Sequence, residues 1–143
     1  MTTGPLISPE MFREFCFDAM KTRIESIKRY KDKVCLHSCG NTRKLMDQLI
    51  ETGIDCYQSL QTGANMELED LIREYGDKIC FWGGIAVETL IGGTPEEVRR
   101  EVRRAIQTGK EFGGFILGSS HSIPYGIKYE NFMALLDEHD KCK

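Results

Sequence analysis

A histidine and a cysteine stand two residues apart at the end of a short apolar run, in the stretch VCLHSCGN from Val34 to Asn41. Residues two apart on a strand point to the same side, so His37 and Cys39 can both reach one point beyond the strand end. Imidazole and thiolate are ligand types that zinc takes. The pair therefore predicts half of a metal site, with the alternative that both residues merely end a buried strand.

The elements that must position this pair follow a repeating pattern. A long helix is expected over residues 8–30, and apolar runs predict strands at residues 34–37, 54–60, 79–82 and 114–117. Helical patterns follow these strands at residues 43–51, after Asn65, after Thr94 and at residues 130–138. Strands alternating with helices indicate parallel strands joined by helical crossovers, so the fold class is α/β with four parallel βα units.

The strand count leaves two architectures open for a single domain over residues 1–143. A (β/α)8 barrel of the TIM type takes about 250 residues, and this chain of 143 residues supplies four strands, or half of one. The alternative is a small open parallel sheet with helices on both faces. A half-barrel would leave two sheet edges unpaired, which favours association.

Helical spacing and end signals predict the helix faces and their starts. In the first helix, the expected apolar face consists of Phe12, Phe15, Ala19, Ile24 and Ile27. Asn65 is expected to cap a later helix that buries Leu68, Leu71, Ile72 and Tyr75. Thr94-Pro95-Glu96-Glu97 has the form of a capping box with proline at the first helical position.

Composition excludes several classes of function. Hydrophobic residues make up 41% and charged residues 29% of the chain, as in globular proteins, and the net charge is −3. Basic residues alternate with acidic ones, so no nucleic-acid partner is expected. There is no apolar run of membrane-spanning length and no secretory signal at the start, and the six cysteines lack the dense spacing of disulfide-rich secreted domains. A cytoplasmic protein without a membrane partner is therefore expected.

Glycine-rich segments and further cysteines complete the candidate residues. Gly83-Gly84 and Gly118-Ser119-Ser120 are expected in the loops after the third and fourth strands. There, Gly83, Gly84, Ser119 and Ser120 are candidates for binding substrate through backbone N–H groups, or glycine simply lets the chain turn. Cys35, Cys56 and Cys80 lie within strands and are expected to pack as small hydrophobic residues. His139 and Cys142 lie in a charged tail and are expected to have no specific role.

Several motifs in order give the chain a family resemblance. The segments LHSCGN, GIDCYQSLQTGANMELEDL, KICFWGGI, GTPEEV, GGFILGSSHSI and YEN together resemble the C-terminal half of the uroporphyrinogen decarboxylase superfamily, which includes corrinoid-linked, zinc-dependent methyltransferases. The resemblance implies the last four strands of a TIM-type barrel. It also implies a fragment, or a barrel completed by a second copy in a dimer or by a separate N-terminal half-barrel.

The resemblance also supplies a third candidate ligand. In the methyltransferase branch, His-x-Cys is followed by a cysteine after the last strand; here the first two positions match as His37 and Cys39, and His121 stands near the third. Histidine also ligates zinc, so a His37–Cys39–His121 site with an open fourth position is implied. The decarboxylase branch carries a histidine near that place and needs no metal, which makes His121 a candidate catalytic acid–base residue as well.

Three functions remain as hypotheses. The first is zinc-dependent methyl transfer to a thiol from a corrinoid on a partner protein. The second is decarboxylation of a porphyrinogen in porphyrin biosynthesis, with His121 moving a proton. The third is a non-catalytic assembly subunit or truncated fragment. Either enzymatic activity is expected only once a complete barrel is assembled.

Overall fold

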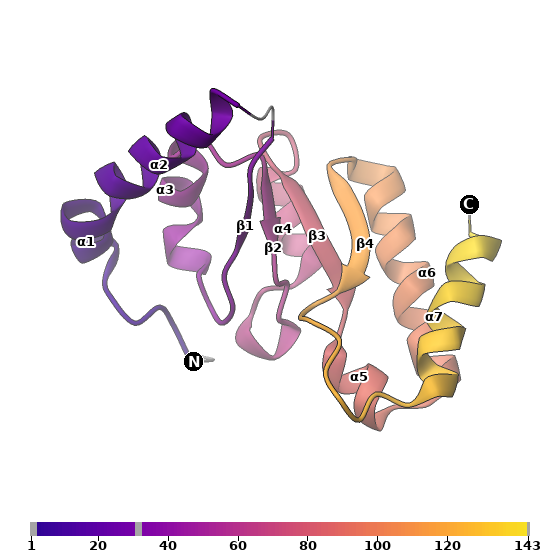
Figure 1. Cartoon of the computed structure of the whole chain (residues 1–143). Coiled ribbons are helices and arrows are strands. Elements are labelled where there is room, and N and C mark those ends of the chain that lie inside the picture. Colours follow the sequence, from indigo (N-terminus) through magenta and orange to yellow (C-terminus); the bar gives the residue numbers. More distant parts are fainter. Residues whose placement is uncertain (1–2, 31–32, 143) are drawn as a thin grey trace.

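The computed structural model describes residues 3–30 and 33–142. Its four parallel strands form one sheet in the order β1-β2-β3-β4, so neighbours in space are also neighbours along the chain (Figure 1). The strands are β1 (Cys35–His37), β2 (Cys56–Gln58), β3 (Cys80–Ile85) and β4 (Phe115–Ser119). The predicted α/β class with four parallel strands is confirmed.

Helical segments join and flank these strands. Before β1 come α1 (Pro9–Phe12), the π-helix η1 (Arg13–Phe17) and α2 (Asp18–Lys28). The later segments are η2 (Arg43–Leu45), α3 (Met46–Glu51), η3 (Thr62–Ala64), α4 (Leu68–Tyr75), α5 (Val87–Gly92), α6 (Pro95–Phe112) and α7 (Tyr129–Lys141). The short helix α5 has no counterpart in the sequence expectations. Within the described residues, none of the helices has the length and apolar character that crossing a membrane demands.

The two faces of the sheet differ in burial. One row of paired residues includes Tyr57 and Phe81, whose side chains are fully buried against the helices. The row on the opposite face includes Trp82 and Ile116, which remain 41% and 47% exposed. Because helices pack on one face and leave the other open, the alternative of an open sheet covered on both faces is wrong. The arrangement is that of a half-barrel.

The first helix buries only part of the expected apolar face. Phe12 and Ile24 are buried as predicted and Phe17 is buried in addition, whereas Phe15 is 67% exposed and Ile27 is 41% exposed. Ala19 is exposed as well. The physical reason is η1, since a π-helical turn is wider than an α-helical turn and rotates the residues after it onto another face.

The predicted N-terminal cap of α4 is wrong, and that of α6 is correct. Asn65 does not cap α4; its left-handed backbone (φ 57°) ends the turn η3, and Glu67 precedes the helix. The capping box of α6 is confirmed. The Thr94 side chain accepts a hydrogen bond from the Glu97 backbone N–H at 3.3 Å, and the Glu97 carboxylate accepts one from the Thr94 N–H at 2.8 Å.

Gly83, Gly84 and Gly118 lie within strands rather than in the loops after them. Gly83 and Gly84 belong to β3, where Gly84 pairs with Gly118 of β4. Gly84 has a φ of +96°, and a Cβ there would lie 3.0 Å from the Cβ of Ala105 in α6. The glycine therefore serves the close approach of α6 to the sheet, and the predicted loop position is wrong.

Candidate metal centre

The structure brings His37, Cys39 and His121 together, although His37 ends β1, Cys39 follows it, and His121 follows β4 at the opposite edge of the sheet. One ligand atom from each residue lies within 4.8 Å of the others. The distance from His37 Nε2 to Cys39 Sγ is 3.1 Å, and the two imidazole rings meet edge to face with their centroids 5.5 Å apart. The curvature of the half-barrel is what lets the end of β1 face the segment after β4.

Gln58 on the neighbouring strand orients the His37 ring. Its Oε1 accepts a hydrogen bond from His37 Nδ1, and its Nε2 donates to the Ser119 carbonyl of β4 at 3.4 Å. The proton on Nδ1 leaves Nε2 of His37 free to act as a ligand. Sequence reasoning missed Gln58, because only the register that pairs His37 with Gln58 reveals it.

A buried tyrosine supports the peptide that joins His37 to Cys39. The Tyr57 hydroxyl donates a hydrogen bond to the Ser38 carbonyl at 2.6 Å and lies 2.7 Å from Thr42 Oγ1. Burial raises the pKa of Tyr57, so this hydroxyl remains a donor across the neutral range. Ser38 N–H continues the sheet ladder by donating to the Gln58 carbonyl at 3.3 Å. The loop that carries Cys39 is thus held from two sides.

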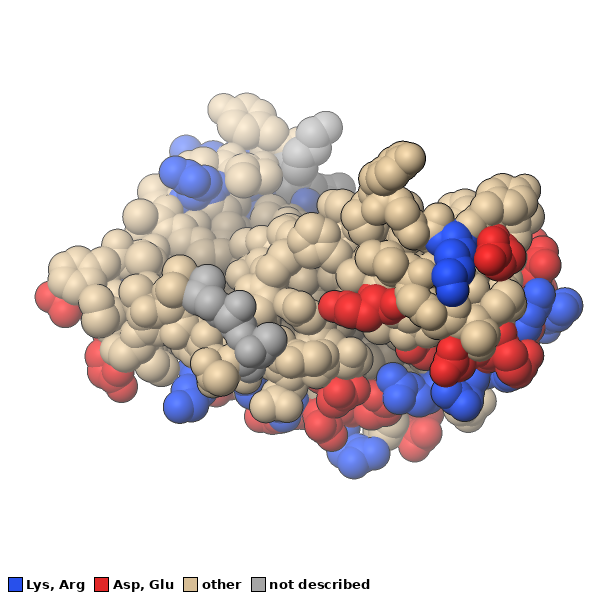
Figure 2. Space-filling view, turned by 90° about the horizontal axis from the view of Figure 1, so that it is seen from below, with Lys and Arg blue, Asp and Glu red and all other residues tan. Residues whose placement is uncertain are grey.

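The ligand group opens into a cavity of about 450 Å³ on the open face of the sheet. Its walls combine polar groups with an apolar part from Trp82 and Ile123; the full lining is Cys35, His37, Gln58, Trp82, Ser119, His121, Ser122 and Ile123. None of these described side chains is a lysine or an arginine. Seen from the carboxyl ends of the strands, the centre of the surface consists mostly of uncharged residues, while charged side chains gather along the lower edge and the right end of the view (Figure 2).

Of the four residues predicted to bind substrate, one lines the cavity and the other three are buried in the sheet or next to α5. Ser119 lines the cavity, and its hydroxyl donates to the His121 carbonyl, which anchors the segment that carries His121. Ser120 is only 2% exposed; it accepts a hydrogen bond from the Val87 N–H at 3.1 Å and joins the end of β4 to α5. Gly83 and Gly84 are likewise buried within β3. The structure therefore places Ser119 alone of these four at the cavity.

The cysteines within strands do not all pack in the core. Cys56 is buried and Cys80 is half-buried, but Cys35 is exposed and lines the cavity. The reason is that Cys35 lies two residues before His37 and so shares its open face of the sheet. The core expectation for Cys35 is wrong.

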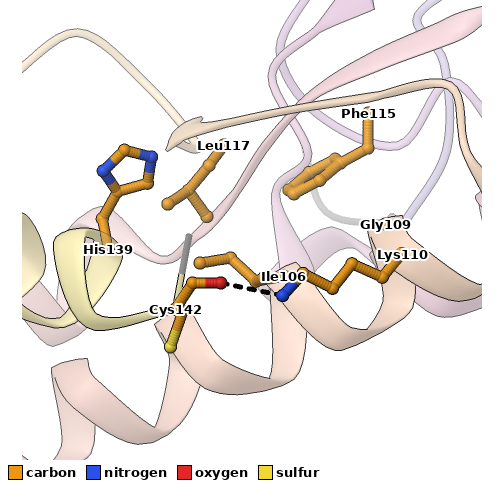
Figure 3. Close-up of a pocket in the computed structure, with 7 residues that line it drawn as sticks. All are labelled: Ile106, Gly109, Lys110, Phe115, Leu117, His139 and Cys142. Carbon is orange, nitrogen blue, oxygen red and sulfur yellow. Dashed lines mark hydrogen bonds between the residues drawn. The ribbon is translucent and has the colours of Figure 1, made fainter.

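His139 and Cys142 lie apart from the His37–Cys39–His121 group. They line a separate groove of about 270 Å³ between α6, β4 and α7, where Ile106, Phe115 and Leu117 supply apolar walls (Figure 3). The Cys142 carbonyl accepts a hydrogen bond from Lys110 Nζ at 2.8 Å. This contact gives the end of α7 a structural anchor on α6.

The donor set of the His37–Cys39–His121 group fits zinc. Two imidazole nitrogens and one thiolate sulfur are common zinc ligands, and three protein ligands leave a fourth position for another molecule. All three residues are exposed, so a ligand in the cavity can reach them. Among residues 3–30 and 33–142, no other three His, Cys, Asp or Glu side chains bring one ligand atom each within 4.8 Å of one another.

Known proteins share both the sequence and the fold. A methylated-thiol–coenzyme M methyltransferase of Methanosarcina mazei is 32% identical over 133 residues, which cover 92% of this chain and 33% of that protein. A uroporphyrinogen decarboxylase of Chlorobium phaeobacteroides is 26% identical over 121 residues, or 84% of this chain and 32% of that protein. The solved structure of a methyltransferase from Methanosarcina mazei superposes with a TM-score of 0.76 at 21% identity, covering 95% of this chain and 38% of that one.

The chain matches only part of each relative but nearly all of the family model. It spans about a third of the length of the curated relatives it matches. The family model for uroporphyrinogen decarboxylase (URO-D) matches residues 2–142, which is nearly all of the chain. The chain therefore belongs to the uroporphyrinogen decarboxylase (URO-D) family.

Proposed function

We propose that this chain is the metal-binding part of a thiol methyltransferase, with zinc held by His37, Cys39 and His121. The observation that carries the proposal is the convergence of three ligand atoms within 4.8 Å of one another at the end of the sheet. The similarity to the Methanosarcina mazei methylated-thiol–coenzyme M methyltransferase supports the reaction class, because that protein is named for methyl transfer involving thiols.

The chain's own residues prepare the site for an acceptor thiol. Gln58 fixes the tautomer of His37, and Tyr57 together with the Gln58 carbonyl holds the Ser38 peptide that precedes Cys39. Bound zinc would supply Lewis acidity that keeps an acceptor thiol in its nucleophilic thiolate form at neutral pH. In this proposal, the methyl group comes from a corrinoid carried by a partner protein. Trp82 and Ile123 provide apolar surface against which the carbon chain of the thiol packs.

The decarboxylase alternative rests on His121 and on the relatives named uroporphyrinogen decarboxylase. A porphyrinogen substrate carries several carboxylates, which arginine and lysine side chains recognise. The described lining of the cavity offers neither residue type. Methyl transfer to a thiol therefore fits this part of the barrel better. Formation of decarboxylated product from uroporphyrinogen by the assembled protein, abolished in His121→Ala, would reverse that preference.

We also propose that a second half-barrel covers the open face of the sheet. The open face exposes Trp82 and Ile116, and each edge strand borders an apolar groove. One groove, of about 550 Å³, lies between α2 and β1 and includes Phe15, Ile27 and Leu36; the other is the groove beside β4 in Figure 3. Light scattering distinguishes a second copy of this chain from a separate N-terminal half-barrel as the partner that covers the open face. A discrete homodimer identifies a second copy, a monomer that forms a one-to-one complex with an N-terminal half identifies a separate chain, and a polydisperse sample contradicts both.

Zinc content tests the metal assignment directly. Untagged protein purified without chelator is expected to contain about one zinc per chain by elemental analysis, and Cys39→Ser and His121→Ala are expected to lose it. The chain offers matched controls, because Cys142→Ser and His139→Ala remove the same residue types outside the site and should retain zinc. Circular dichroism melting checks that each variant is folded. Stoichiometric zinc in folded Cys39→Ser would refute the assignment.

A further inference from the structure

Three cysteines form a row across the sheet that the proposed zinc site does not use. Cys35 of β1 pairs in register with Cys56 of β2, and Cys56 pairs in register with Cys80 of β3. On each strand the cysteine precedes a member of the His37–Gln58–Trp82 row by two residues. The two rows therefore lie on the same open face of the sheet. Three thiols on successive strands therefore share one surface below the metal centre.

The central and outer thiols of the row differ in exposure. Burial raises the pKa of the Cys56 thiol. Cys56 is buried, but Cys35 at the end of the row is exposed and forms part of the cavity wall. The row is therefore accessible from the cavity at Cys35 and shielded at Cys56.

Strand spacing brings neighbouring thiols in register within reach of one metal ion. Neighbouring strands lie about 4.8 Å apart, and side chains paired in register leave the same face of the sheet side by side. Two metal–sulfur bonds of about 2.3 Å, the length of zinc–thiolate bonds, span up to about 4.6 Å between the two sulfur atoms. Thiols on adjacent strands can therefore both reach one metal ion.

We propose that Cys35 and Cys56 form a second metal site, which binds a soft monovalent ion of the Cu(I) class between two sulfur ligands, with Cys80 as an adjacent third sulfur. Soft ligands of this kind select Cu(I). Binding displaces one proton from each of the two thiols, and no electron is transferred. The site is independent of the proposed methyl transfer, since none of its ligands belongs to the His37–Cys39–His121 group.

The test removes the zinc ligands first, so that the two sites cannot be confused. The full chain carrying Cys39→Ser and His121→Ala is titrated anaerobically, under reducing conditions, with Cu(I) in competition with the chromophoric chelator bicinchoninate. We expect uptake of about one Cu(I) per chain. Adding Cys35→Ser to this background should weaken binding by more than the roughly 10- to 100-fold that loss of an outer-shell partner costs.

Two further variants make the result decisive. Cys56→Ala should weaken Cu(I) binding like Cys35→Ser, whereas Cys16→Ser, outside the row, should leave it unchanged. Because Cys35 is exposed, Cys35→Ser keeps the test valid even where Cys56→Ala fails to fold. Unchanged Cu(I) affinity in folded Cys35→Ser, or no uptake by the folded background protein, would overturn the proposal. Neither result bears on zinc, which is measured separately on the unsubstituted chain.

Discussion

Gln58 Oε1 accepts a hydrogen bond from His37 Nδ1 across the β1–β2 pair, while Nε2 of the same imidazole lies 3.1 Å from Cys39 Sγ. The His37 ring is thus fixed through Nδ1 by the neighbouring strand, while its Nε2 faces Cys39. The amide decides which nitrogen carries the proton and therefore which nitrogen is available to a metal ion. Gln58 is the residue through which the sheet controls the proposed ligand.

Replacing this amide should weaken zinc binding without removing a ligand. Gln58→Leu is expected to lower zinc affinity by about 10- to 100-fold, because an unheld imidazole loses its preferred tautomer and orientation. Gln58→Glu keeps an acceptor oxygen and should recover most of the affinity. Competition with a chromophoric zinc chelator measures the zinc affinity of both variants. Gln48→Leu is the matched control, because the Gln48 amide donates to the Pro9 carbonyl and not to a residue of the site. Equal affinity in Gln58→Leu and unsubstituted protein would show that Gln58 has no such role.

Tyr57→Phe should affect both stability and metal binding. Removing the hydroxyl leaves the Ser38 carbonyl and Thr42 without their partner, and the expected loss in the free energy of unfolding is about 1 kcal/mol. Because Ser38 lies between His37 and Cys39, zinc affinity should fall as well. Urea unfolding and zinc competition measure the two effects. A stability loss with unchanged zinc affinity would confine Tyr57 to a scaffold role.

Asp55 gives the start of β1 a dependence on pH. Burial alone would raise the pKa of Asp55, but hydrogen bonds from Lys28, at 2.8 Å, and from the Val34 N–H, at 2.9 Å, lower it overall. A carboxyl group with a lowered pKa stabilises the fold above the pKa of about 3.9 that it has when unfolded, and this stabilisation is lost as the pH falls through the folded value.

The Asp55→Asn variant tests this contribution. It is expected to be less stable than the unsubstituted chain at pH 7 by about 1.5 kcal/mol, with a difference that shrinks in strongly acidic solution. Urea unfolding across the acidic range provides the measurement, and Asp77→Asn, at an exposed position, serves as the control. A difference that stays constant across the whole range would mean that the charge of Asp55 is not the cause.

Gly118→Ala should move the only tryptophan of the chain. A Cβ at Gly118 would lie 2.4 Å from Nε1 of Trp82, so the indole ring must shift from its place over β4. We expect a change in tryptophan emission and a stability loss of about 1–3 kcal/mol, as in other overpacked sites. Gly63→Ala is the control, because a Cβ there meets nothing within 4 Å. An unaltered emission spectrum in Gly118→Ala would contradict the observed packing.

Local sequence patterns predicted the order of strands and helices well, but they failed where the outcome depended on packing. The apolar run before His37 and the capping box at Thr94 act through neighbours in the chain, and the structure contains both. The run through Gly83 and Gly84 continues as strand because α6 packs closely on it, which no local signal reports. Likewise, the π-helical turn before α2 changes the buried face without an evident mark in the sequence.

The candidate site shows the same division. His37 and Cys39 are neighbours on one strand end, so their spacing alone predicts a shared ligand. The approach of His121 depends on the curvature of the whole sheet, and was implied by the family resemblance rather than by spacing. Gln58 and the row of Cys35, Cys56 and Cys80 depend on strand register, which a single sequence does not specify.

The open face of the sheet has a consequence for how the protein must be assayed. Trp82, His37 and His121 border a cavity, and the described residues form its wall on one side. In our proposal, another half-barrel supplies the remaining wall. The fraction of complete cavities then follows mass action, so it falls on dilution and rises with the concentration of both halves. Specific activity per chain, unlike that of an ordinary monomeric enzyme, would increase with protein concentration until the dissociation constant of the two halves is exceeded.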